Sequence, residues 1–174
     1  STGLQNGESI GHVALTSTGQ ANTAGVAGSP YAIKASGAAG GSFDIANYAV
    51  TYMDGNLTVT PAPITVTANG GTSIYGSSPS DPRFTATGLK NGQDESVLTG
   101  LSNSFGIGPT TNVVGSPYTL SVLGALTNPN YTITARNTGI WTVTPAPLTI
   151  AADDRSKVYG DTFAFIGSEF SSTG

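Results

Sequence analysis

NLTVTPAPITVTA (residues 56–68) returns 84 residues later as IWTVTPAPLTIAA (residues 140–152). Each copy is an alternating stretch, a Pro-Ala-Pro joint and a second alternating stretch. In the first copy the apolar positions are Leu57 and Val59 before the joint and Ile64 and Val66 after it. Apolar residues at every second position predict strands with one buried face. The phrase therefore predicts a tandem repeat of small β-modules.

Further matches extend the repeat over the whole chain. Gly-Ser-Pro-Tyr occurs at residues 28–31 and again at 115–118, and Asn-Tyr occurs at 47–48 and at 130–131. If a module runs from one Pro-Ala-Pro joint to the next, residues 62–146 are a complete module. Residues 1–61 are then the C-terminal part of a preceding module, and residues 147–174 are the N-terminal strands of a third.

Composition narrows the class of protein. The 174 residues include 10 acidic and 6 basic side chains, a net charge of −4, and only 9% of residues are charged. Nucleic-acid and anionic-membrane partners require clustered Lys and Arg, so both are excluded as expectations. The sequence has no cysteine, which rules out disulfides and thiolate metal sites. No apolar run approaches the 18 residues of a membrane-spanning helix, so no membrane insertion is expected.

The alternation places strands at residues 64–69, 73–75, 83–87, 101–107, 118–123, 131–135 and 140–144. Gly, Asn and Pro mark turns between them. Six or seven short strands per repeat predict an all-β chain of small antiparallel modules. Each module is an immunoglobulin-like sandwich or, alternatively, a β-grasp-like sheet. The modules are expected to follow end to end in a rod.

The inter-module joint is the strongest functional signal in the sequence. Proline fixes the backbone angle φ and has no amide N–H, so the joint prolines are expected to lie outside the strand ladders. They would form a short, extended and stiff spacer between modules. The joint residues are Pro61, Pro63, Pro145 and Pro147.

Aromatic residues are the candidates for ligand binding, since sugars stack on exposed rings. The tyrosines proposed for a glycan-binding face are Tyr31, Tyr52 and Tyr118. Trp141 occupies the repeat position of Leu57 and is expected in a core or joint. Tyr75 and Tyr159, each followed by glycine, are expected to close the end of a small core.

No catalytic, metal or cofactor site is expected. Asp153, Asp154 and Asp161 lie near one another in sequence, but they lack the spacing of known calcium loops. We interpret them as a solvated acidic turn. The one histidine, His12, has no histidine counterpart in the second copy, and a nucleophile needs a base beside it. The chain is therefore not expected to be an enzyme.

A family resemblance rests on four phrases in order: TGLKNG (87–92), GSPY (115–118), NYTIT (130–134) with WTVTPAP (141–147), and TVTPAPLTIAADDRSKVYGDTF (142–163). Together they resemble the MBG repeats of the YGX type. Those repeats occur in tandem in large secreted bacterial adhesins of the filamentous-haemagglutinin kind. The resemblance implies an extracellular β-domain on the bacterial cell surface.

The expected function is that of a structural stalk or filament segment of a surface adhesin. One alternative is an adhesion module that binds glycan or mucin on another cell. A second is a self-assembling fibre subunit, in which residues 147–174 of one chain complete residues 1–61 of the next by strand addition. The expected partners are neighbouring modules or identical chains and, for the first alternative, cell-surface glycans.

Overall fold

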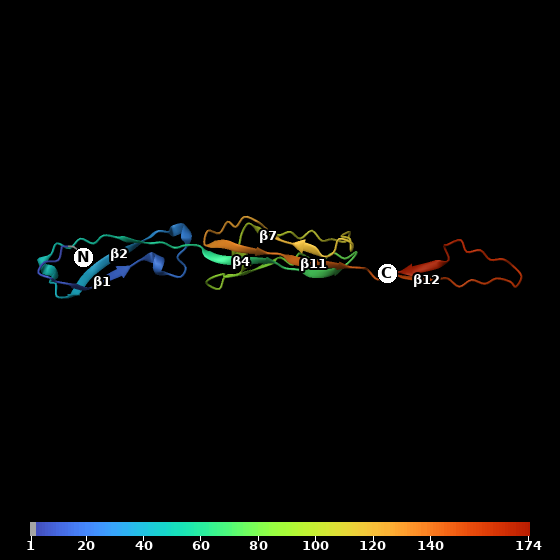
Figure 1. The fold of residues 1–174 in the computed structure, drawn as a ribbon, viewed down its shortest axis with the longest axis horizontal. Helices are drawn as coiled ribbons and strands as arrows, with labels where there is room; N and C mark the ends of the chain where they lie inside the picture. Colours follow the sequence, from blue (N-terminus) through green and yellow to red (C-terminus); the bar gives the residue numbers. More distant parts are fainter. Residues whose placement is uncertain (1–2) are drawn as a thin grey trace.

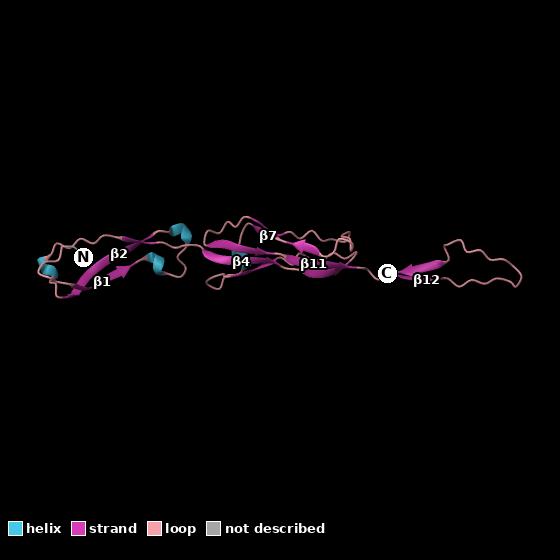
Figure 2. Ribbon diagram, viewed as in Figure 1, coloured by secondary structure: helices cyan, strands magenta, loops and turns pink. Residues whose placement is uncertain are grey.

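The computed structural model describes residues 3–174, which form three parts laid end to end in a long, narrow molecule (Figure 1). We call them the N-terminal part (residues 3–61), the central module (62–146) and the C-terminal hairpin (147–174). All three consist of strands and loops, and the helical elements are 3-10 turns of three residues (Figure 2).

The N-terminal part contains β1 (Ile10–Thr16), β2 (Tyr31–Gly41), β3 (Gly55–Leu57) and the turns η1 (Thr18–Gln20), η2 (Val26–Gly28) and η3 (Ile45–Asn47). The first strands of the central module are β4 (Ala62–Ala68), β5 (Gly71–Ile74) and β6 (Phe84–Thr87), followed by the turn η4 (Glu95–Val97). Its remaining strands are β7 (Leu101–Asn103), β8 (Tyr118–Leu120), β9 (Val122–Gly124), β10 (Tyr131–Asn137) and β11 (Gly139–Thr144). The C-terminal hairpin pairs β12 (Thr149–Ala152) with β13 (Phe170–Thr173).

Two long paths run side by side through the central module. One is β4 followed by β5, and the other is β10 followed by β11. The β4–β10 and β5–β11 pairs are both parallel, whereas β6, β8 and β9 pair antiparallel with β4, β11 and β7 respectively. The chain enters the module at one end and leaves at the other, so its first and last strands must run in the same direction.

Glycines allow the two paths to cross closely where both pass from the β10-β4-β6 sheet to the β5-β11-β8 sheet. A Cβ atom on Gly70 would lie 2.2 Å from the backbone oxygen of Ile140, and one on Gly139 would lie 2.3 Å from that of Ala68. Both distances are far below van der Waals contact. Only residues without a side chain fit this crossing in its present geometry.

The hydrophobic core lies in the central module and draws on both sheets. Alternate residues of β4 point into it, and β11 contributes in the same way. Its buried members are Ile64, Val66, Ala68, Phe84, Leu98, Leu120, Val122, Tyr131, Trp141 and Val143. Trp141 is 6% exposed, donates its indole N–H to the Ser73 hydroxyl at 2.9 Å, and packs edge-on against Phe105. The expectation that Trp141 fills a core is confirmed.

The N-terminal part repeats the local contacts of the second half of the central module. The N–H of Gln5 donates to the Tyr48 hydroxyl at 3.0 Å, as the N–H of Lys90 donates to the Tyr131 hydroxyl at 3.1 Å. The N–H of Val59 donates to the Ser29 hydroxyl, as that of Val143 donates to Ser116, both at 2.9 Å. This part therefore has the local structure of residues 88–146. Within residues 3–174 no strands lie beside it in the places that β4 and β5 occupy in the central module.

The C-terminal hairpin repeats the first half of the module in the same register. In the β4–β6 pair Ala68 faces Phe84 and Thr65 faces Thr87. In the β12–β13 pair Ala152 faces Phe170 and Thr149 faces Thr173.

The predicted all-β class of small modules is confirmed, and the seven predicted strands of the central module all overlap observed ones. Two features differ from expectation. The parallel pairs make the sheets mixed rather than purely antiparallel. A β-grasp sheet requires a covering helix, and within residues 3–174 the helical elements are single 3-10 turns.

The prediction that all joint prolines lie outside the ladders was wrong for Pro63. Pro63 belongs to β4 and is level with Thr132 of β10. The N–H of the preceding Ala62 points to β10 and donates to the Asn130 oxygen at 2.8 Å. Backbone directions alternate along a strand, so the nitrogen of Pro63 faces the other side. There the ladder with β6 begins only at Thr65, and proline deprives no partner of a donor.

Candidate functional site: the joint between modules

The joint is the place where the N-terminal part meets the central module. Residues 58–61 connect β3 to β4 as a single extended segment. The connection is fixed on one side by the Val59–Ser29 hydrogen bond and on the other by the Ala62–Asn130 hydrogen bond. Pro61 lies between these two fixed points and stiffens the segment.

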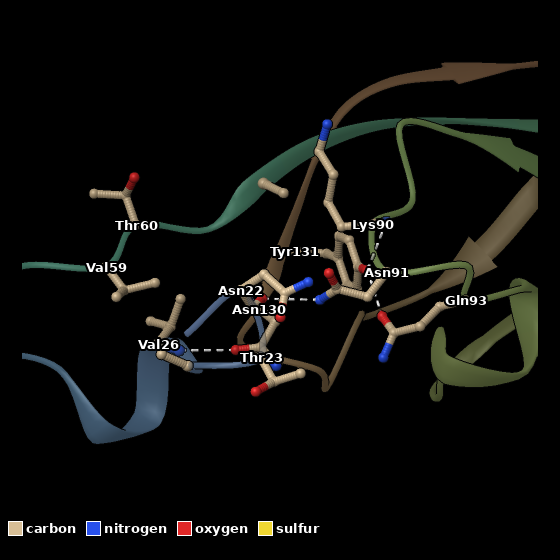
Figure 3. Close-up of a pocket in the computed structure, with 12 residues that line it drawn as sticks. Asn22, Thr23, Val26, Val59, Thr60, Lys90, Asn91, Gln93, Asn130 and Tyr131 are labelled. Atoms are coloured by element: carbon tan, nitrogen blue, oxygen red, sulfur yellow. Dashed lines mark hydrogen bonds between the residues drawn. The ribbon is translucent and has the colours of Figure 1, made fainter. Parts of the chain in front are cut away.

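Two asparagine side chains of the central module bind backbone groups of the N-terminal part. The Asn130 side-chain oxygen accepts the N–H of Val26 at 2.8 Å, and the Asn91 side-chain nitrogen donates to the Asn22 oxygen at 3.0 Å (Figure 3). A Cβ on Gly25 would lie 3.0 Å from Asn130 Oδ1, so glycine permits this approach. The joint therefore combines one covalent connection with two non-covalent contacts.

Each asparagine is itself held in place. Asn91 has φ of 56° and precedes Gly92 with φ of 70°, a left-handed turn that asparagine and glycine accept. Asn130 donates its own N–H to the Asn128 side chain at 3.0 Å, while its oxygen binds Ala62. Because both side chains start from constrained backbone, little conformational entropy is lost when they bind across the joint.

A cavity of about 410 Å³ lies between the two parts at this joint. Backbone and amide groups line it together with small apolar side chains, and the Tyr131 hydroxyl donates to Gln93 at its wall (Figure 3). Its lining residues are Asn22, Thr23, Ala24, Val26, Val59, Thr60, Ala62, Lys90, Asn91, Gln93, Asn130 and Tyr131.

The three tyrosines proposed for ligand binding have internal hydrogen bonds and do not form one cluster. Tyr31 donates its hydroxyl to Gly25 at 2.7 Å, and Tyr118 donates to Asn112 at 2.6 Å in the equivalent place of the next module. Tyr52 is 39% exposed, and its hydroxyl accepts the Ala38 N–H at 2.8 Å.

The remaining sequence candidates are scattered. His12 is exposed in β1. The expectation that Tyr75 and Tyr159 close the end of a core was wrong, because their side chains are 45% and 100% exposed. Asp153 forms an ion pair with Arg155 at 3.1 Å. Among residues 3–174 no three His, Asp or Glu side chains converge as metal ligands would. In the same range no helix has the length and apolar character needed to cross a membrane.

In the two parts that meet at the joint, hydrogen bonds shift the pKa values of two groups. The side-chain hydrogen bond to Glu8, more than any other factor, raises the pKa of the Tyr48 hydroxyl. The Ser96 hydroxyl and N–H donate to Asp94 and lower the pKa of that carboxyl group. Both shifts come from hydrogen bonds that stabilise the local fold. Neither group is a reactive side chain in the cavity.

Sequence reasoning found the joint but missed the residues that bind across it. Asn91 and Asn130 have counterparts at Asn6 and Asn47, and Asn6 has the same left-handed backbone with φ of 52°. Recurrence of these asparagines in both copies was the available signal.

Comparison with known proteins supports the resemblance to the MBG repeats for the central module. Residues 64–140 match the family model described as MBG domain (YGX type). No curated protein and no solved structure gave a match.

Proposed function

We propose, from the premise that residues 64–140 are an MBG domain of the YGX type, that the chain is a stiff spacer segment of an extracellular bacterial surface adhesin. Its function is to keep a constant distance between the parts of the adhesin that it connects. The observation that carries the proposal is the joint, where Asn91 and Asn130 bind the preceding module directly.

Recurrence of the joint supports a rod rather than a single bend. Asn6 and Asn47 stand where Asn91 and Asn130 do, and Pro145 and Pro147 stand where Pro61 and Pro63 do. A joint built from recurring residues gives each module a similar orientation to its neighbour. Similar small rotations repeated along a tandem array produce a regular, extended filament.

The strand register sets the length gained per module. Ala62 is level with Tyr131, and the extended chain from Tyr131 to Ala146 then runs toward the next module. At about 3.3 Å per strand residue, the 15 steps correspond to about 50 Å per module. Two such lengths and the C-terminal hairpin give on the order of 140 Å for residues 3–174 by the same rise.

The parallel ladders suit a molecule under tension. Force on the two ends of the central module pulls β4 and β11 away from each other along the strand direction. The β4–β10 and β5–β11 hydrogen bonds lie across that direction. They would therefore be loaded together in shear rather than opened one at a time.

Small-angle X-ray scattering of the chain and of the double variant Asn91→Ala/Asn130→Ala tests the proposal. At low protein concentration we expect the parent chain to give a maximum dimension near 140 Å and a pair-distance distribution of a rod, on the strand-rise estimate. The double variant should give a broader distribution with a shorter mean end-to-end distance, because only the covalent connection remains.

Asn56→Ala is the matched control, since Asn56 is exposed in β3 and its side chain makes no hydrogen bond within residues 3–174. It should scatter like the parent chain. A compact or freely bending parent chain would contradict the spacer function. Equal scattering of the parent chain and the double variant would mean that the two asparagines do not contribute to the stiffness of the joint.

Binding to glycan or mucin stays a prediction. The hydroxyls of Tyr31, Tyr52 and Tyr118 are engaged in internal hydrogen bonds, so the proposal made here does not depend on them.

A further inference from the structure

We infer that Asn91 is a site of spontaneous deamidation, and that conversion of its side-chain amide to a carboxylate loosens the joint between modules. The loosening rests on the spacer function, because it changes the joint on which that function depends. The modification itself needs no enzyme. Its reactants are the Asn91 side chain, the backbone nitrogen of the following Gly92, and water.

The reaction is a ring closure followed by hydrolysis. The backbone nitrogen of Gly92 attacks Cγ of Asn91, a new N–Cγ bond forms, and the Cγ–Nδ2 bond breaks. Nδ2 leaves as ammonia together with the proton that the Gly92 nitrogen gives up. Water then opens the cyclic imide at either of its carbonyl groups and leaves aspartate or isoaspartate at position 91. Glycine in the second position favours ring closure, because it has no Cβ to crowd the attacking nitrogen.

The turn that contains Asn91 is held at its two ends and free at its tip. The Lys90 N–H donates to the Tyr131 hydroxyl, and the Gln93 N–H donates to the Lys90 oxygen, both at 3.1 Å. Asn91 and Gly92 between them are exposed, and the Gly92 N–H donates no hydrogen bond within residues 3–174. A Cβ on Gly92 would meet no atom within 4 Å, so the tip has open space in which to rotate toward the geometry of ring closure.

A second Asn-Gly pair of the central module, Asn69 and Gly70, lacks this freedom. The Asn69 side-chain nitrogen donates to the Pro82 oxygen at 3.0 Å, and its side-chain oxygen accepts the Thr85 hydroxyl at 3.2 Å. Gly70 lies at the close crossing with Ile140. Ring closure there must break both side-chain hydrogen bonds and move packed backbone, so the fold protects this pair while leaving the pair at 91–92 accessible.

Deamidation turns one contact across the joint from attraction into repulsion. The Asn91 side-chain nitrogen donates to the Asn22 oxygen at 3.0 Å (Figure 3). A carboxylate has no N–H to donate, and it brings a negative charge against that carbonyl oxygen. Of the two asparagine contacts across the joint, the one from the Val26 N–H to Asn130 then remains. The joint therefore becomes less stiff as position 91 is converted.

Peptide mass spectrometry of the full chain, sampled during incubation in mildly alkaline buffer, tests the modification site. Each Asn-Gly pair is followed separately by the mass gain of amide-to-acid conversion. We expect Asn91 to be converted at least about tenfold faster than Asn69, because the Asn69 amide must first lose two hydrogen bonds. Equal rates at the two positions, or faster conversion of Asn69, would overturn the assignment.

A matched pair of glycine variants tests the ring-closure mechanism. Gly92→Ala should slow conversion of Asn91 at least about tenfold, because its Cβ crowds the attacking nitrogen. Gly76→Ala is the control, since Gly76 also has a positive φ and open space around its Cβ position but follows Tyr75. It should leave the conversion rate of Asn91 unchanged. An unchanged rate in Gly92→Ala, or equal slowing in both variants, would overturn the mechanism.

Small-angle X-ray scattering of Asn91→Asp tests the loosening of the joint. We expect a broader pair-distance distribution than that of the parent chain, because the charge of the product is present in every molecule. Asn56→Asp adds the same charge at an exposed position of β3 and should scatter like the parent. Equal scattering of Asn91→Asp and a rod-like parent would overturn the loosening and leave the spacer function standing. A parent chain that already bends freely would overturn both, and the ranking of conversion rates would still decide the modification site.

Discussion

Alanine substitution at two equivalent repeat positions, Ile64 and Leu148, measures how far stability depends on completion of a module. Ile64 is 1% exposed in the core of the central module, and Leu148 is 67% exposed in the C-terminal hairpin. Ile64→Ala removes buried carbon atoms and leaves a cavity, so we expect a loss of about 2–5 kcal/mol in the free energy of unfolding. Leu148→Ala removes atoms that water already contacts, and the expected change is within about 0.5 kcal/mol.

Urea unfolding followed by tryptophan fluorescence suits this comparison. Trp141 is the one tryptophan of the sequence and lies buried in the central module against Phe105. With a slope of about 1–3 kcal/mol per molar urea for a small domain, the Ile64→Ala loss lowers the midpoint by roughly 1 M or more. The measurement is made at low micromolar concentration, so that association between chains does not contribute.

Two results would refute the reasoning. A midpoint of Ile64→Ala equal to that of the parent would mean that Ile64 does not stabilise a packed core. A midpoint of Leu148→Ala as low as that of Ile64→Ala would mean that the C-terminal hairpin is part of the same folding unit as the central module. Either outcome contradicts a chain of separately packed modules.

Two further changes test other parts of the structure. Gly70→Ala should lower the same urea midpoint, by about 1–3 kcal/mol in free energy, because the added Cβ meets backbone 2.2 Å away, whereas Gly106→Ala meets no atom within 4 Å and should not. The lowered pKa of Asp94 means that its ionised form stabilises the fold above its usual pKa of 3.8, and this contribution is lost as pH falls through the folded pKa. The urea midpoints of the parent and of Asp94→Asn should therefore converge in acid, and a constant difference would contradict this role.

Much of the fold follows from the sequence because local signals and tertiary structure agree. Alternating apolar residues predicted β4 and β11, and these strands bury the expected side chains. Trp141 was placed in a core because it replaces Leu57 in the repeat, and it is buried. In each case the burial of a side chain depends on which face of its strand it lies on. The alternation of apolar and polar residues already specifies that face.

The strand pairing could not be predicted from alternation, which says which residues are buried but not which strands are neighbours. The parallel pairs of β4 with β10 join residues about 70 positions apart. The place of Pro63 inside β4 depends on that pairing, since a proline is tolerated only where its nitrogen faces no partner. Two further contacts depend on how modules meet, those of Asn91 and Asn130 with the N-terminal part.

One geometric requirement follows from the end-to-end order of the modules. A module that is entered at one end and left at the other must have first and last strands running in the same direction, as β4–β5 and β10–β11 do. Those strands come from opposite ends of the module's sequence, so the core forms only when the two halves meet.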